Sequence, residues 1–205
     1  MSANSETEAK IIQAARDVFL HKGKAGARLQ DIADVAGINK ALLHYYFRSK
    51  DRLYEKVFEQ IVSDFLSEFL DSFSTDEDFR ETLKSFIDKY LTALSKHPEV
   101  VRFVMWEIKE GGVFFAEQAR GMFASRGFET IPLISVIQKA VAEGRIRPVD
   151  PVQLTISIIG MCLYPFIAQP LLEKIIPGIE VQNDDFLSRR SDEIFDLVWR
   201  GVGLA

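Results

Sequence analysis

The chain has 205 residues, of which 47% are hydrophobic and 27% charged, and one cysteine, Cys162. This composition allows a substantial buried core and excludes a disordered, fibrous or disulfide-stabilised protein. The net charge of −5 is unevenly divided, since residues 1–56 carry 10 Lys and Arg against 7 Asp and Glu, a net of +3, and the remainder carries −8. A basic end on an acidic body fits a protein that presents one region to phosphate.

The first 50 residues contain three short helical patterns. Ser5-Glu6-Thr7-Glu8 has the spacing of a capping box, and apolar residues follow at helical intervals until Gly23 and Gly26. A second pattern covers 29–36, a turn falls at Gly37, and Asn39 is placed to cap a third helix over 40–47. Three short helices within 50 residues predict a compact head.

The remaining residues predict a helical body. Ser49 is placed to cap a fourth helix, Asp150 is placed to cap one that has Pro151 at its first position, and Pro165, Pro170 and 177–178 interrupt the chain after it. The periodicity predicts helices over 51–70, 79–94, 99–110, 128–143, from 152 onward and over 184–202, with 113–123 ambiguous. No convincing alternating strand occurs, so we expect an all-α fold of about nine to ten helices.

Residues 152–172 carry no charge and approach the roughly 20 residues needed to cross a bilayer. Against a span stand several polar residues and two prolines, and the flanks lack a clear Lys or Arg cluster. We therefore expect a helix buried between protein elements and no membrane partner. No basic segment followed by an apolar stretch occurs at the N-terminus, so we expect the cytoplasm as the compartment.

Residues 29–47 have the spacing of a helix-turn-helix. Ala33 is small enough to let the two helices cross closely, and Gly37 accepts the positive φ of a tight turn. Ile32, Ile38 and Leu43 supply the apolar contacts between the helices. The pattern predicts a motif whose second helix can enter the major groove of DNA.

The third helix has two chemically different faces. At 100° per residue, one face carries Leu43, Tyr46 and Phe47 and should pack, while the other should face outward. Donors, small groups and aromatic rings suit the major groove, where they meet base edges and thymine methyl groups. The outward face and its edges comprise Lys40, Ala41, Leu42, His44 and Tyr45.

Residues 31–53, DIADVAGINKALLHYYFRSKDRL, resemble the signature of the TetR/AcrR family of transcriptional regulators. The resemblance implies a DNA-binding domain over 1–50 and an effector-binding and dimerisation domain over 51–205. It also implies that Lys40, Ala41, His44 and Tyr45 face bases, and that phosphates are held by Asn39, Tyr46 and Lys50.

The sequence departs from the family pattern at three positions. Arg28 stands where a Thr or Ser usually caps the second helix, Ala41 replaces a common Gly, and His44 replaces a common Tyr. These differences bear on base preference rather than on the fold. We expect Arg28 to contact a phosphate directly.

The body is rich in aromatic residues and methionine. Most of these residues must be core, but such a body can also line an apolar ligand pocket between helices, and the resemblance supports one there. The candidates for lining it are Phe103, Met105, Trp106, Phe128, Met161 and Tyr164. We expect a small, apolar or amphipathic effector.

The uncharged helix near 152–169 and the amphipathic helix over 184–202 form the predicted homodimer surface. The sequence thus predicts a ligand-responsive regulator that binds a palindromic operator in double-stranded DNA, with repression favoured over activation. Neither a catalytic motif nor a His, Cys or Asp cluster with metal-ligand spacing occurs, so we expect no enzyme activity, cofactor or metal. The alternative is a helical small-molecule-binding or interaction protein without sequence-specific DNA binding.

Overall fold

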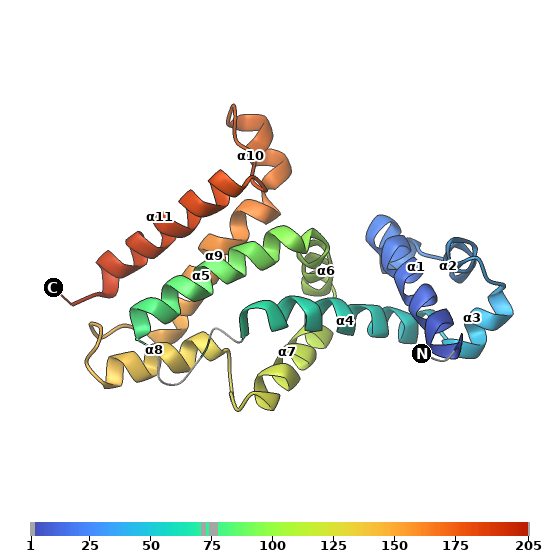
Figure 1. Ribbon diagram of the computed structural model, residues 1–205, viewed down its shortest axis with the longest axis horizontal. Coiled ribbons are helices and arrows are strands. Elements are labelled where there is room, and N and C mark those ends of the chain that lie inside the picture. The colour runs from blue at the N-terminus through green and yellow to red at the C-terminus, as the bar shows by residue number, and fades with distance from the viewer. Residues whose placement is uncertain (1–2, 71–72, 74–77, 205) are drawn as a thin grey trace. The chain divides into compact units, whose positions relative to one another are not determined.

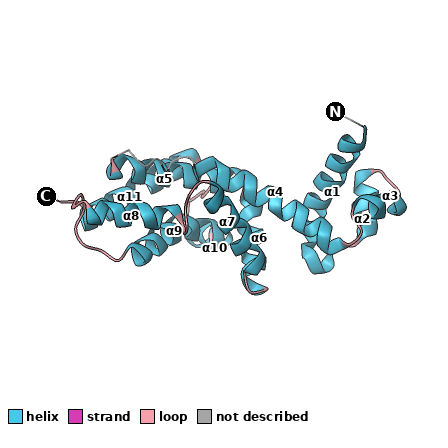
Figure 2. Ribbon diagram, turned by 90° about the horizontal axis from the view of Figure 1, so that it is seen from below, coloured by secondary structure: helices cyan, strands magenta, loops and turns pink. Residues whose placement is uncertain are grey.

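The computed structural model describes residues 3–70, 73 and 78–204. These residues form eleven α-helices, with one isolated bridge between Ile146 and Gly203 (Figures 1 and 2). The all-α prediction is confirmed.

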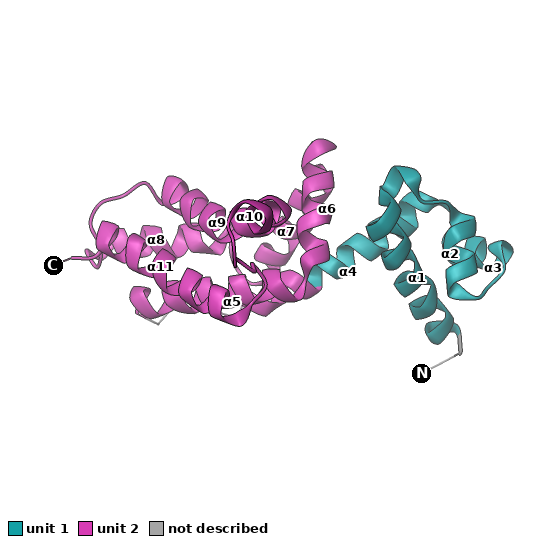
Figure 3. Ribbon diagram, turned by 90° about the horizontal axis from the view of Figure 1, so that it is seen from above, with its two compact units in different colours: residues 1–63 teal, residues 64–205 magenta. Residues whose placement is uncertain are grey.

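The chain divides into two compact units, Met1–Ser63 and Asp64–Ala205 (Figure 3). The division lies within α4 (Lys50–Leu70), whereas the sequence predicted a boundary at residue 50, where this helix begins. One continuous helix therefore contributes residues to both units.

Unit 1 contains α1 (Ala3–Gly26), α2 (Leu29–Ala36), α3 (Lys40–Tyr46) and the first part of α4. A non-helical Gly23, with φ 68°, interrupts α1 near its C-terminus. The core includes the fully buried side chains of Phe19, Ile32, Leu43 and Phe58. Because every helix of the unit supplies one of these side chains, the short α2 and α3 are stabilised by packing.

Unit 2 holds the end of α4 and seven further helices, of which α5 packs against several. It comprises α5 (Phe79–Lys96), α6 (Pro98–Lys109), α7 (Val113–Ser125), α8 (Pro132–Ala142), α9 (Pro151–Ile167), α10 (Gln169–Ile175) and α11 (Asp184–Val202). α5 packs against α6, α8, α9 and α11, and α9 also packs against α11 (Figure 1). Fully buried Phe79, Leu83, Ile87 and Phe103 form part of the core.

Prolines account for two differences from the prediction. The helix expected over 128–143 begins instead at Pro132, because a residue before proline is disfavoured in the helical region and Ile131 is extended, with ψ 120°. Pro165 was expected to interrupt the chain, but it lies inside α9, which continues to Ile167. The ambiguous segment 113–123 is helical and belongs to α7.

Among the described residues, no single helix is both long and apolar enough to cross a membrane. α9 and α10 satisfy that test only when taken together, and they are bent by 68° at the break between them.

Candidate DNA-binding surface and effector cavity

The turn between α2 and α3 is built around Gly37. This glycine has φ 66° and ψ 32°, the left-handed conformation that favours residues without a Cβ. Its N–H donates to the Asp34 carbonyl at 3.2 Å, and the Ile38 N–H donates to the Ala33 carbonyl at 3.0 Å. Ile32 and Ala33 have no exposed surface. The local geometry is that of the predicted helix-turn-helix.

α3 begins at a defined cap and has one buried and one exposed face. Asn39 Oδ1 accepts a hydrogen bond from the Leu42 N–H at 2.8 Å, as the sequence predicted. Leu43 and Phe47 are buried, whereas the Tyr45 side chain is 76% exposed. The other exposed residues on α3 are Lys40, Ala41, Leu42 and His44. The structure thus brings the predicted base-facing residues together on one surface.

Three residues predicted to hold phosphates have contacts inside unit 1. The Tyr46 hydroxyl donates a hydrogen bond to Asn4 Oδ1, and its ring meets that of Tyr45 edge to face at 5.5 Å. Lys50 Nζ donates to the Ala27 carbonyl at 3.2 Å. Asn39 uses its side-chain oxygen as a cap and keeps its amide NH2 for another acceptor. These contacts fix the positions of the three side chains.

Several cations close in sequence to α2 and α3 are exposed. Arg28 precedes α2, makes no side-chain cap, and is exposed. Within the described part of the chain, Arg28, Lys40 and Arg48 have no ion-pair partner. Arg48, two residues after the end of α3, was not among the predicted contacts. Unpaired cations on one small unit suit binding to a polyanion.

An ion pair stabilises the packing of α1 on α2. Lys22 Nζ lies 2.7 Å from Asp31 Oδ2. This hydrogen bond holds the pKa of the Asp31 carboxyl below its ordinary value. The Asp31 carboxyl therefore stays ionised, and the Lys22 ammonium balances its charge.

Unit 2 contains an apolar cavity of about 420 Å³. Its walls come from α4, α5, α6, α7 and α9, together with Phe73 and the start of α8. The lining residues are Phe65, Leu66, Phe69, Phe73, Phe86, Tyr90, Leu94, Val100, Val101, Val104, Phe115, Ala116, Ala119, Arg120, Phe123, Ile131, Pro132, Ile159 and Leu163. Its volume lies within the range of about 300–1,000 Å³ that is typical of small-molecule sites.

Aromatic rings form one wall of this cavity. Phe69 meets Tyr90 edge to face at 5.0 Å, and Phe86 stacks on Tyr90 at 5.4 Å. Phe65 and Phe73 extend the cluster. Burial raises the pKa of Tyr90 above its ordinary value, so this phenol stays neutral. The wall therefore offers flat apolar surface without charge.

The lining residues include none of the six predicted from the sequence. Phe103 is fully buried against Trp106, Tyr164 is 56% exposed, and Met161 uses its carbonyl to accept from Arg190. Met105, Trp106 and Phe128 are half-buried, and Phe128 contacts the lining residue Phe73 at 6.3 Å. A ligand role for the six stays a prediction. α6 and α9 do line the cavity, through Val100, Val101, Val104, Ile159 and Leu163.

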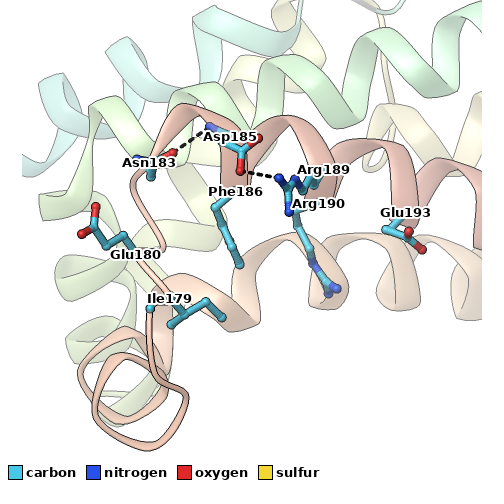
Figure 4. Close-up of a pocket in the computed structure, with 9 residues that line it drawn as sticks. Ile179, Glu180, Asn183, Asp185, Phe186, Arg189, Arg190 and Glu193 are labelled. Carbon is cyan, nitrogen blue, oxygen red and sulfur yellow. Dashed lines mark hydrogen bonds and ion pairs between the residues drawn. The ribbon is translucent and has the colours of Figure 1, made fainter.

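A second, open hollow of about 490 Å³ lies where the segment before α11 meets that helix (Figure 4). It is polar, and three of its charged side chains, Asp185, Arg189 and Arg190, make contacts within the chain. Asp185 pairs with Arg189 at 3.0 Å, and Arg190 extends from α11 to the Met161 carbonyl of α9 at 2.8 Å. It is less suited to an apolar effector than the aromatic cavity.

No group of three or more His, Cys, Asp or Glu that could hold a metal ion occurs among the residues that the structure describes. Cys162 is buried in α9, and burial raises the pKa of its thiol to about 12. This cysteine remains protonated and unsuited to binding a metal as thiolate.

Comparison with known proteins finds family matches in two parts of the chain. Residues 11–57 match bacterial regulatory proteins of the tetR family, and residues 80–198 match the tetracyclin repressor-like C-terminal domain. The regulator RutR of Escherichia coli O157:H7 is 28% identical, over 98% of this chain and 92% of RutR. The repressor NicS of Pseudomonas putida is 28% identical over 77% of this chain and 74% of NicS.

The crystal structure of AibR in complex with isovaleryl coenzyme A and operator DNA superimposes with a TM-score of 0.70 at 17% identity. It covers 93% of this chain and 97% of AibR. The likeness confirms the fold.

A helix-turn-helix head with a helical body defines this chain as a DNA-binding, ligand-responsive transcriptional regulator. It belongs to the tetR family of bacterial regulatory proteins. Members of this family bind operator DNA and small-molecule effectors, and dimerisation is typical of them.

Proposed function

We propose that this regulator binds a palindromic operator as a homodimer in the cytoplasm and represses transcription until an effector enters the apolar cavity of unit 2. The observation that carries the DNA-binding role is the outer face of α3, with Tyr45 76% exposed beside Lys40 and His44 over the buried Leu43 and Phe47. Exposed polar and aromatic groups on a helix fixed by its opposite face are suited to reading base edges.

The roles on the DNA follow from the chemistry of each side chain. Base edges are contacted by Lys40, Ala41, Leu42, His44 and Tyr45, and phosphates by Arg28, Asn39, Tyr46, Arg48 and Lys50. Phosphate contacts set the register of the protein on the duplex, and base contacts discriminate sequences. In a twofold dimer, the two copies of α3 would enter successive major grooves about 34 Å apart.

The proposed dimer surface lies on α9 and α11. Val152, Ile156 and Tyr164 recur at multiples of four along α9 and are exposed by 44%, 58% and 56%. Leu197 on the neighbouring α11 is 65% exposed. Exposed apolar residues on two packed helices are a surface that a monomer leaves in water and that a twofold partner covers.

The effector is proposed to act through α4. This helix contributes Phe65, Leu66 and Phe69 to the cavity, and its first residues belong to unit 1. A ligand that changes the packing of α4 alters the helix that directly follows the helix-turn-helix. A coupling of about 1–3 kcal/mol changes operator affinity roughly 5- to 150-fold. The relative NicS is named a repressor, which supports repression as the direction.

Fluorescence anisotropy with DNA from upstream of the chain's own gene, at two salt concentrations and beside unrelated DNA, tests the proposal. We expect selective, salt-sensitive binding that a Lys40→Ala, Tyr45→Ala double variant loses while it remains folded by circular dichroism. Lys89→Ala on α5 is the matched control and should bind as the unaltered protein does. Retained affinity in the double variant, or failure of a random-site selection to yield any operator, would contradict it.

A further inference from the structure

Among the residues that line the apolar cavity, the charged one is a cation. Every lining residue is apolar except Tyr90, whose phenol is neutral, and Arg120, whose guanidinium is always protonated. No carboxylate is among the lining residues of the described chain. An ammonium group bound here would face a cation and no counter-charge, whereas an anion would find one partner.

Arg120 lies on the face of α7 that borders the cavity. Ala116 and Phe123, four residues before it and three after it, both line the cavity, as does the adjacent Ala119. These spacings place the four residues on neighbouring parts of one helical surface. The Arg120 side chain is exposed, so it lies at the solvent side of an otherwise apolar wall.

Arg120 has neither a hydrogen-bond nor an ion-pair partner among the described residues. Glu117, one turn earlier on the exposed part of α7, makes no ion pair with it. An arginine presents a planar fork of donors that matches the two oxygens of a carboxylate, and the pair is strongest when water is partly excluded. A carboxylate bound to Arg120 would have the apolar wall on one side, which excludes water from that side only.

We propose that the effector is an amphipathic monocarboxylate, with its apolar body in the cavity and its carboxylate on Arg120. The proposal rests on the proposed function, which takes this cavity as the effector site. The aromatic wall and the volume of about 420 Å³ suit an effector whose apolar part is a medium-length alkyl chain or a single ring system. The positive charge of Arg120 favours a negatively charged head group.

Calorimetric titration of the full-length protein with octanoate, 1-octanol and octylamine tests the head group while the apolar chain stays the same. We expect octanoate to bind more tightly than octylamine. In Arg120→Gln, octanoate should bind about five- to tenfold more weakly, whereas the affinity for 1-octanol should change by less than about twofold. Arg102→Gln, on the exposed side of α6 and outside the cavity lining, is the matched control and should change neither.

The outcomes separate failure of this proposal from failure of the proposed function. Equal weakening of octanoate and 1-octanol in Arg120→Gln, or octylamine binding as tightly as octanoate, would overturn the carboxylate while leaving an apolar effector site in place. Tighter binding of octanoyl coenzyme A than of octanoate would overturn the free acid in favour of a thioester. If none of the probes binds, the carboxylate proposal falls, whereas the DNA-binding part of the proposed function is decided separately by the anisotropy experiment.

Discussion

The two units carry out recognition in opposite ways. Unit 1 presents its candidate surface outward on the seven residues of α3, and the residues proposed to touch DNA lie between Arg28 and Lys50. Unit 2 encloses its candidate site, and the lining residues extend from Phe65 to Leu163. A surface site depends on one well-fixed helix, whereas a cavity depends on the faces that several helices turn toward one another.

This contrast is sharpest at two adjacent leucines of α3. Leu43→Ala should lower the free energy of unfolding by about 2–5 kcal/mol, because a fully buried leucine leaves a cavity in a small core. Leu42→Ala, at a position 37% exposed, should change stability by less than about 0.5 kcal/mol and weaken DNA binding instead. Chemical denaturation and anisotropy measure the two effects. Equal loss of stability in both variants would show that α3 does not have one buried and one exposed face.

Alanine substitutions at two glycines allow a turn in unit 1 to be compared with a helix in unit 2. Gly37→Ala should destabilise by about 1–2 kcal/mol, because the position is left-handed although an added Cβ meets no atom within 4 Å. Gly121→Ala, inside α7 with equally open surroundings, should stabilise by about 0.5–1 kcal/mol. Thermal unfolding of the two variants beside the unaltered chain gives both signs. A stabilising Gly37→Ala would contradict the strained turn.

The salt dependence of DNA binding tests whether Arg28, which stands where the family usually has a Thr or Ser, contacts a phosphate. Arg28→Ala should make the slope of log affinity against log salt concentration shallower by about one unit, since one phosphate contact is lost. The measurement is an anisotropy series at several salt concentrations. Lys89→Ala, on unit 2, should leave the slope unchanged. An unaltered slope in Arg28→Ala would mean that this arginine lies away from the phosphates.

The smallest expected effect concerns two carboxylates, one in each unit. Burial raises the pKa of Glu68, but hydrogen bonds from His97 at 2.7 Å and Lys96 at 3.3 Å outweigh it, so the pKa lies below 4.5. The stability that the ionised Glu68 contributes is present above pH 4.5 and is lost as the pH falls through its lowered pKa. Glu68→Gln should therefore destabilise the protein at pH 7 and much less at pH 3.5.

The counterpart in unit 1 is Asp31, whose pKa is lowered by the hydrogen bond from Lys22. Asp31→Asn should show the same direction with pH but a smaller difference, because this exposed pair is screened by solvent. Urea denaturation of both variants at the two pH values gives the comparison. A Glu68→Gln effect that grew toward low pH would contradict a lowered pKa.

The sequence predicted unit 1 in detail because its determinants are local. Gly37 at the turn, Asn39 as the cap and Leu43 on the buried face act within a few residues of one another, and the structure places each as predicted. Arg48, two residues after the end of α3, was not among the predicted contacts and joins the proposed ones because it is exposed and has no ion-pair partner among the described residues. Helix propensity, capping and helical periodicity decide such features, and all three can be recognised in the local sequence.

In unit 2 the sequence predicted most of the helices, although it left α7 ambiguous and did not predict α10, and it did not determine which face of each helix borders the cavity. Composition favoured Phe103, Trp106, Met161 and Tyr164, whereas the cavity uses smaller neighbours such as Val104 and Leu163 on the same helices. Since successive helical residues point about 100° apart, a shift of one or two positions moves a side chain from the cavity to the core or to solvent.

The sequence by itself therefore determined the all-α class, the helix-turn-helix with its outward face, and most helices of the body, because these follow from local periodicity and turn chemistry. The tertiary structure alone decided the cavity and the isolated cation at its rim. A cavity is the space left when helices distant in sequence pack together, and its lining depends on how each helix is rotated by contacts with all the others.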